Sequence, residues 1–264
     1  DLHSFPTRRS SDLQLVEGKM KNVAAFFDID GTLSRDSLMI EHFKMLMKYN
    51  IIDSQVWYSE LKPLYDRYDK RFANYEIYLE TLSKVYSEKI KGMNKFFNEF
   101  IAKQVIENHG DRVYRYTRNR IKHHIERGHF IFFISGSPDF LVERIALKYN
   151  AKSFKGSTYI VDEHASYTGE VIPMWSSDKK REQLYTFVKE YDVDVENSFA
   201  YGDTTGDFSM FENVGNPTTI NPTKELIDKI NSNDKVKDKI KIIVERKDVI
   251  YELSSNVKTI DISF

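Results

Sequence analysis

The chain has 264 residues, 41% of them apolar and 14% aromatic, which is enough to bury a substantial core in one or two domains. Its 39 Lys and Arg nearly balance 40 Asp and Glu, so the overall charge does not indicate a nucleic-acid or membrane partner. The absence of cysteine excludes disulfide frameworks, thiolate zinc sites and cysteine nucleophiles, and the longest apolar runs are too short to span a bilayer. We therefore expect a cytoplasmic protein without stable membrane insertion.

The first nineteen residues are expected to be an artefactual or disordered leader. The segment from Ser4 to Leu13 resembles the in-frame translation of a widely used sequencing adapter, and it lacks the apolar stretch of a secretory signal. Met20 is the expected true start, and 1–19 is left out of the fold prediction.

The first predicted strand, Val23 to Phe27, runs directly into Asp28-Ile29-Asp30-Gly31-Thr32. Two carboxylates this close raise each other's pKa and need a proton or a cation between them. Asp28 is the candidate nucleophile, since an aspartate can form an aspartyl-phosphate. Asp30 is the candidate general acid, which would protonate the leaving oxygen and later deprotonate water.

A helical segment follows, and its periodicity predicts that 34–112 forms a small cap over the strand ends. The expected helices cover Asp36 to Tyr49, Asp53 to Tyr68, Tyr75 to Tyr86 and Asn94 to His109.

The remaining sequence alternates predicted strands and helices. Strands are expected at His129 to Ile134, Ser198 to Tyr201, Thr218 to Ile220 and Ile240 to Val244, with a β-hairpin over Lys155 to Ile172. Helices are expected at Tyr114 to Arg127, Pro138 to Tyr149, Asp178 to Tyr191 and Gly206 to Asn213, with Ser137 as the N-cap of the second. This alternation predicts a doubly wound, parallel α/β sheet whose core spans 20–33 and 113–264.

Polar residues follow two further strands and should meet the Asp28 pair at one crevice. Ser135 and Gly136 can offer a hydroxyl and backbone N–H groups to phosphate, and Lys180 can neutralise phosphate and hold Asp28. Asp203 and Asp207 add carboxylates, which Mg²⁺ accepts as ligands. We expect Asp28 and Asp203 to bind the metal directly with Asp207 in support. Asp30 is also counted in the metal site, and Thr32 among the phosphate-binding residues.

These four motifs, in this order, resemble those of the haloacid dehalogenase superfamily, and the resemblance covers about Val23 to Phe264. The helical insertion is similar to the C1-type cap of the phosphoserine phosphatase-like branch, subfamily IB. The resemblance implies a Rossmann-like core, Mg²⁺ and a phosphatase acting on a small phosphomonoester. Lys180 is preferred over Lys179 because the spacings to Leu184 and Asp203 match those of phosphoserine phosphatases.

The substrate is left open. Phosphoserine phosphatases place a Glu where this chain has Ser37, and their cap arginine aligns loosely with Leu82. Glu41, or a cap arginine such as Arg35, Arg67 or Arg71, could compensate. Phosphoserine and a lipid phosphate therefore stay alternatives to another small metabolite, and the sequence is silent on oligomeric state.

Three other kinds of protein compete with a phosphatase. A receiver-like signalling domain is also phosphorylated on an Asp, but it has no eighty-residue insertion after its first strand. A phosphomutase would need a bisphosphate activator. A nucleic-acid-binding module is the weakest alternative, because the basic stripe of Arg112, Arg115, Arg118 and Lys122, with Arg120 nearby, is expected to be a solvated helix face. The histidines His109, His123, His124, His129 and His164 are expected at the surface. The aromatic residues of the cap are expected in the core, among them Trp57, Tyr58, Tyr65, Tyr68, Phe72, Tyr75 and Tyr78.

Overall fold

The computed structural model describes residues 21–70, 72 and 75–260. The predicted leader, 1–19, and Arg71 lie outside the described residues. Eight strands form one sheet in the order β4-β3-β2-β1-β5-β6-β7-β8. Their bounds are Ala24–Phe27 for β1, Phe130–Pro138 for β2, Ser153–Val161 for β3, Tyr167–Ile172 for β4, Phe199–Gly202 for β5, Asn216–Ile220 for β6, Lys241–Arg246 for β7 and Val249–Leu253 for β8.

The central strands run parallel, as the sequence predicted. β1 pairs in parallel with β2 on one side and β5 on the other, and the parallel pairing continues to β3 and to β6 and β7. The edge strands β4 and β8 are antiparallel to their neighbours. Parallel sheets need helices on both faces, so a central strand such as β1 is apolar throughout.

Alternate residues of β1 enter two separate cores. Ala25 and Phe27 belong to the apolar cluster on one face of the sheet, and Ala24 and Phe26 to the cluster on the other. The first face is covered by α6 (Arg115–Glu126) and α7 (Asp139–Lys148). The second is covered by helices that all follow β4, namely α8 (Ser177–Glu190), α9 (Phe208–Asn213), α10 (Lys224–Asn231) and α11 (Asp234–Lys237). This arrangement confirms the doubly wound α/β fold.

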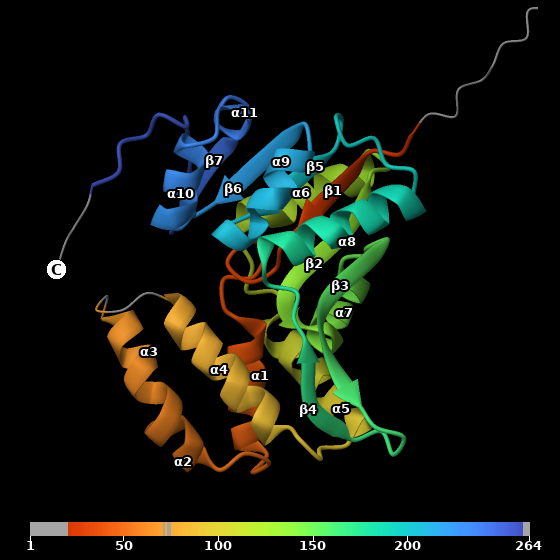
Figure 1. Cartoon of the computed structure of the whole chain (residues 1–264), viewed down its shortest axis with the longest axis vertical. Helices are drawn as coiled ribbons and strands as arrows, with labels where there is room; N and C mark the ends of the chain where they lie inside the picture. Colours follow the sequence, from red (N-terminus) through yellow and green to blue (C-terminus); the bar gives the residue numbers. More distant parts are fainter. Residues whose placement is uncertain (1–20, 71, 73–74, 261–264) are drawn as a thin grey trace, which may run out of the picture.

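The segment between β1 and β2 is helical. It contains α1 (Leu38–Lys48), α2 (Ser54–Val56), a π-helical turn (Trp57–Leu61), α3 (Lys62–Asp69), α4 (Tyr75–Lys89) and α5 (Lys95–His109). In Figure 1, α1 to α4 lie below the sheet, beside the long β3–β4 hairpin. Buried residues of α1, α4 and α5 join the apolar cluster that covers the first face of the sheet. The division of the chain into a cap at 34–112 and a core stays a prediction.

Two local predictions differ from the structure. β2 continues past Ile134 to Pro138, and α7 begins at Asp139 with Pro138 as its N-cap, so Ser137 does not cap this helix. The pairing of β2 with β3 is irregular between Ile134 and Pro138, which carries the strand through the predicted helix start. The strand β8 and the helices α10 and α11 were not predicted.

Among the described residues, no helix has both the length and the apolar character that crossing a membrane requires.

Candidate active site

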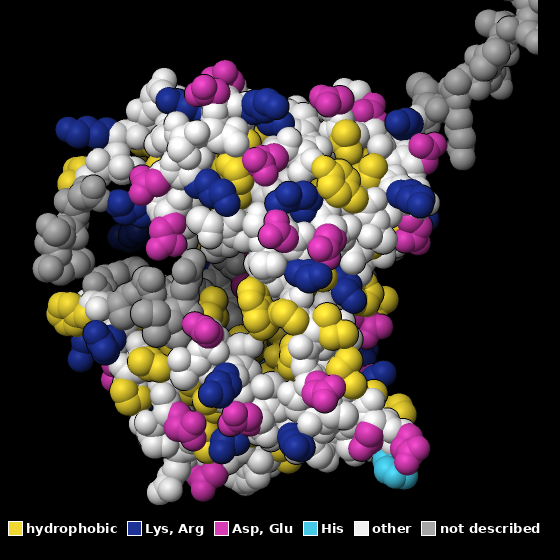
Figure 2. Space-filling view, viewed as in Figure 1, with side chains coloured by type: hydrophobic (Ala, Val, Ile, Leu, Met, Phe, Trp, Pro, Cys, Tyr) yellow, Lys and Arg dark blue, Asp and Glu magenta, His cyan; other side chains and the backbone are white. Residues whose placement is uncertain are grey.

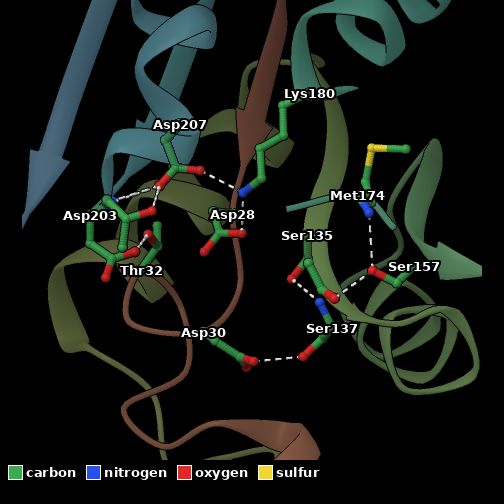
Figure 3. A network of polar contacts seen from close by, with 12 residues as sticks. Asp28, Asp30, Thr32, Ser135, Ser137, Ser157, Met174, Lys180, Asp203 and Asp207 are labelled. Atoms are coloured by element: carbon green, nitrogen blue, oxygen red, sulfur yellow. Dashed lines mark hydrogen bonds and ion pairs between the residues drawn. The ribbon is translucent and has the colours of Figure 1, made fainter. Parts of the chain in front are cut away.

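Three neighbouring strands bring the predicted motifs together at one edge of the sheet. Asp28 follows β1, Asp203 follows β5, and Ser135 and Gly136 lie in the last part of β2. β2 and β5 flank β1 in parallel register, so their carboxyl ends lie side by side. Figure 3 shows these side chains around the end of β1, with Lys180 reaching them from α8.

Three carboxylates form the centre of the site. Asp28, Asp203 and Asp207 each place a carboxylate oxygen within 4.8 Å of the others. Asp28 is 5% exposed and Asp207 is fully buried. Asp207 is the last residue of a 3₁₀ turn (Thr205–Asp207). Its side chain is held in place because Asp207 Oδ2 accepts hydrogen bonds from the backbone N–H groups of Asp203 and Thr204, both at 3.0 Å. Thr204 is the N-cap residue of this turn.

Lys180 supplies the positive charge of the cluster. Its Nζ donates to Asp28 Oδ1 at 2.7 Å and to Asp207 Oδ1 at 2.6 Å, and the residue is 3% exposed. Burial alone would lower the pKa of Lys180, but the carboxylates of Asp207 and Asp28 raise it. The ammonium therefore stays charged and holds Asp28 in place, as the sequence predicted.

One lysine cannot balance three carboxylates, two of which, those of Asp28 and Asp207, are buried. Burial, together with the nearby charge of Asp207, raises the pKa of Asp28 to about 7 in spite of Lys180. Burial and the charges of Asp207 and Asp28 raise the pKa of Asp203 well above its ordinary value. A second cation would relieve this repulsion, and a hard divalent ion such as Mg²⁺ prefers carboxylate oxygens. The donor set therefore fits Mg²⁺.

Asp30 stands apart from the three converging carboxylates. Its Oδ2 accepts Ser137 Oγ at 2.6 Å and Ser37 Oγ at 3.3 Å, while its Oδ1 accepts the backbone N–H of Leu38 at 3.1 Å. Figure 3 shows the carboxylate directed toward Ser137 and away from Asp203. Burial raises the pKa of Asp30, although these three hydrogen bonds act against the shift. The prediction that Asp30 is a metal ligand has no support from the position of its side chain.

Thr32 differs from its predicted role. It is fully buried, and its hydroxyl donates to Asp203 Oδ1 at 2.8 Å. It therefore orients a carboxylate of the cluster, and its assignment as a phosphate-binding residue has no support from this geometry. The neighbouring residue, Gly31, lies so close to Asp203 that a side chain would not fit: an added Cβ would be 2.1 Å from Asp203 Oδ2. Its φ of +84° also favours glycine.

Hydrogen bonds from neighbouring segments hold the part of β2 that contains Ser135 and Gly136. Ser135 is buried, and its Oγ accepts the backbone N–H of Ser137 at 3.2 Å. Gly136 O accepts the hydroxyl of Ser157 at 2.7 Å, and Ser157 Oγ in turn accepts the backbone N–H of Met174 at 3.1 Å. Ser157 thus ties β2 to the segment that leads into α8 and Lys180 (Figure 3). The assignment of Ser135 and Gly136 to phosphate stays a prediction.

The residues considered for binding the rest of the substrate are mostly buried or already paired. Ser37 is engaged with Asp30, and Leu82 is fully buried in the apolar core. Glu41 is already paired with Lys44 at 2.8 Å. The remaining candidates in the described part of the chain, Arg35 and Arg67, are exposed.

Some of the surface predictions are wrong. His124 is fully buried, with its Nε2 2.8 Å from Tyr201 Oη, and burial lowers its pKa to about 3. The four residues of the predicted basic stripe are exposed, as expected, whereas the nearby Arg120 is half-buried and donates to the Tyr201 hydroxyl at 3.1 Å. Tyr58 and Phe72, which were expected in the core, are 63% and 64% exposed.

Comparisons with known proteins agree with this geometry. The family model of haloacid dehalogenase-like hydrolases matches residues 25–212, so the chain belongs to this family. This confirms the superfamily predicted from the four motifs. The segment matched contains all of them.

A curated relative is the "inhibition of morphological differentiation protein" of Streptomyces azureus. It is 23% identical over 210 residues, which cover 78% of this chain and 74% of the relative.

Solved structures share the fold at low sequence identity. A protein of unknown function from Bordetella pertussis Tohama I is 14% identical with a TM-score of 0.66, covering 81% of this chain and 96% of its own. A phosphoserine phosphatase, solved as a phospho-aspartyl intermediate analogue, is 21% identical with a TM-score of 0.56. The match covers 87% of this chain and 96% of the phosphoserine phosphatase. The fold is therefore similar to that of phosphoserine phosphatases.

Proposed function

We propose that the protein is a Mg²⁺-dependent phosphatase that hydrolyses a small phosphomonoester through an aspartyl-phosphate on Asp28. The observation that carries the proposal is the buried contact between Asp28 and Lys180 beside two further carboxylates. Membership of the hydrolase family supports it independently.

In the first step, an Asp28 carboxylate oxygen forms a bond to phosphorus while the bond from phosphorus to the ester oxygen breaks. Asp30, in its protonated form, gives its proton to the departing oxygen, which leaves as an alcohol. Lys180 keeps Asp28 oriented during the attack. Ser135 and the backbone at Gly136 bind the phosphate oxygens, as proposed from their place at the end of β2.

In the second step, Asp30 acts as a base and takes a proton from water. The water oxygen bonds to phosphorus, the bond from phosphorus to Asp28 breaks, and phosphate leaves with the Asp28 carboxylate regenerated. Asp30 is protonated again and ready for another turnover. One carboxyl group thus serves as acid and base in succession.

Asp28, Asp203 and Asp207 would hold the metal, because their carboxylate oxygens are the ones that converge. Bound Mg²⁺ would offset the negative charge of the carboxylates and of the phosphate. Thr32 keeps Asp203 in place, and Lys180 does the same for Asp207.

The alcohol that is esterified to phosphate in the substrate is a separate question from the reaction. Ser37 and Leu82 stand at positions where phosphoserine phosphatases are expected to carry charged residues, and neither offers a charge to an amino-acid substrate. We therefore propose a small phosphorylated metabolite other than phosphoserine as the substrate.

Phosphate release from 4-nitrophenyl phosphate tests the activity. We expect turnover that requires Mg²⁺ and disappears in Asp28→Asn. A panel with phosphoserine, sugar phosphates, nucleotides and lysophosphatidate would identify the alcohol. A phospho-Asp28 that persists for minutes would favour a receiver-like domain, and a need for a bisphosphate with little net phosphate release would favour a phosphomutase.

A further inference from the structure

Ser137 makes the shortest of the three hydrogen bonds that hold Asp30. The distance from Ser137 Oγ to Asp30 Oδ2 is 2.6 Å, within the range of a charge-assisted O–H···O bond. Ser37 reaches the same oxygen at 3.3 Å, and the Leu38 amide reaches Oδ1 at 3.1 Å. The strongest restraint on the carboxylate therefore comes from β2.

The hydroxyl of Ser137 has no competing structural role among the described residues. The helix that follows has Pro138 as its N-cap and no side-chain capping bond. The Ser137 hydroxyl donates to Asp30 Oδ2. A serine buried at a strand end, with its hydroxyl on a carboxylate 107 positions away in sequence, is placed to control that carboxylate.

The backbone around Ser137 is also fixed. Its N–H donates to Ser135 Oγ at 3.2 Å, and the adjacent Gly136 carbonyl accepts Ser157 Oγ at 2.7 Å. The irregular pairing of β2 with β3 between Ile134 and Pro138 is the kind of feature that redirects a side chain. These hydrogen bonds hold the backbone on either side of the Ser137 side chain, which lies between Asp30 and Ser157 in Figure 3.

We propose that Ser137 is a positioning residue that fixes the Asp30 carboxyl group for proton transfer to the leaving oxygen. The inference rests on the proposed phosphatase function and concerns a residue that the four motifs do not assign. Both serine hydroxyls donate to Oδ2, so this oxygen remains an acceptor. Oδ1 receives one amide hydrogen and has its second lone pair available for the acid proton. That proton passes to the ester oxygen, and Ser137 keeps its own.

Leaving groups of different basicity test this role. Phenyl phosphate needs a proton on its departing oxygen, whereas 4-nitrophenyl phosphate, similar in shape, releases a stable anion. For Ser137→Ala we expect kcat/KM to fall about 10- to 100-fold with phenyl phosphate and by less than about threefold with 4-nitrophenyl phosphate. The KM values should change little.

Two further variants calibrate the effect. Ser37→Ala should show the same preference but a smaller loss, because its bond to Asp30 is longer. Ser198→Ala removes another fully buried serine hydroxyl, at the amino end of β5, where it accepts the backbone N–H of Ala24. It should lower kcat/KM for phenyl phosphate and for 4-nitrophenyl phosphate by the same factor, or change neither. If Ser137→Ala does not fold, the near-isosteric Ser137→Cys replaces it, since a thiol is only a weak donor.

The outcomes separate the two proposals. If the wild-type protein hydrolyses neither aryl phosphate with Mg²⁺ present, the phosphatase function itself is wrong. If the wild type hydrolyses both and the folded Ser137 variant loses both rates by the same factor, or neither rate, Ser137 does not position the acid.

Discussion

Lys180 Nζ lies 2.7 Å from Asp28 Oδ1, and both side chains are almost completely buried. The two residues are 152 positions apart, so the contact exists only because β1 and the start of α8 meet at the same edge of the sheet. Burying one ammonium among three carboxylates leaves an excess of negative charge. This excess makes the site a place for a cation and a phosphoryl group, and it has measurable consequences.

Replacing Lys180 by methionine should destabilise the metal-free protein. The substitution leaves Asp28 and Asp207 without their shared cation, and breaking a buried ion pair costs about 3–5 kcal/mol. Urea unfolding in the presence of EDTA measures this loss. Lys179→Met is the matched control, because Lys179 is exposed, and its loss should cost about 0.5 kcal/mol or less. Equal effects of both substitutions would contradict the account.

Binding of Mg²⁺ should weaken as the pH falls below 7. The pKa of Asp28 is raised to about 7, so at lower pH the metal must displace a proton from this carboxyl group. For one displaced proton, the apparent Kd should rise about tenfold per pH unit. Calorimetric titration at several pH values measures it. A Kd that is constant from pH 5 to pH 7 would exclude Asp28 as a ligand.

Gly31→Ala should disrupt the same site from the backbone side. A methyl group at this position would lie 2.1 Å from Asp203 Oδ2, and the φ of +84° is itself unfavourable for alanine. We expect weaker Mg²⁺ binding and a lower melting temperature. Gly128→Ala is the control, because Gly128 also has a positive φ but nothing lies within 4 Å of its added Cβ. The control should lower the melting temperature without changing the affinity for Mg²⁺.

His42 should make the protein less stable in mild acid. Burial lowers the pKa of His42 to about 3 from 6.5, so the unfolded chain takes up a proton below pH 6.5 and the folded chain does not. This contribution lowers the free energy of unfolding by about 1.4 kcal/mol per pH unit as the pH falls from 6.5 toward 3. Urea unfolding at several pH values gives the slope of the free energy of unfolding against pH. This slope should be smaller by that amount in His42→Leu, while His164→Asn, at an exposed position, should keep the wild-type slope. An unchanged slope in His42→Leu would contradict this.

The sequence was sufficient to predict the strand ends and the acids on them. The apolar run before Asp28 and the polar residues at the end of β2 and after β5 are local patterns, and the parallel connection of their strands brings them together. The partners of individual side chains were not predictable in the same way. Thr32 binds Asp203, and Ser137 binds Asp30, across more than a hundred residues of sequence.

Other errors have comparable physical causes. The Ser-Pro pair at 137–138 has the composition of a helix start, but pairing with β3 keeps it in the strand. His124 lies in a polar stretch of α6, and only the packing of that helix against Phe199 and Tyr201 reveals that it is covered. The exposure of a polar residue on a helix thus depends on its neighbours in the fold.

The most direct test of the account is to trap the phosphorylated enzyme. Asp30→Asn, mixed with 4-nitrophenyl phosphate and Mg²⁺, should release one equivalent of nitrophenolate per site and then stop, because the base for the second step is missing. Rapid quenching and peptide mass spectrometry should locate one phosphoryl group on Asp28, and Asp28→Asn/Asp30→Asn should carry none. Sustained turnover by Asp30→Asn without a phosphoprotein, or a phosphoryl group on another residue, would contradict the central claim.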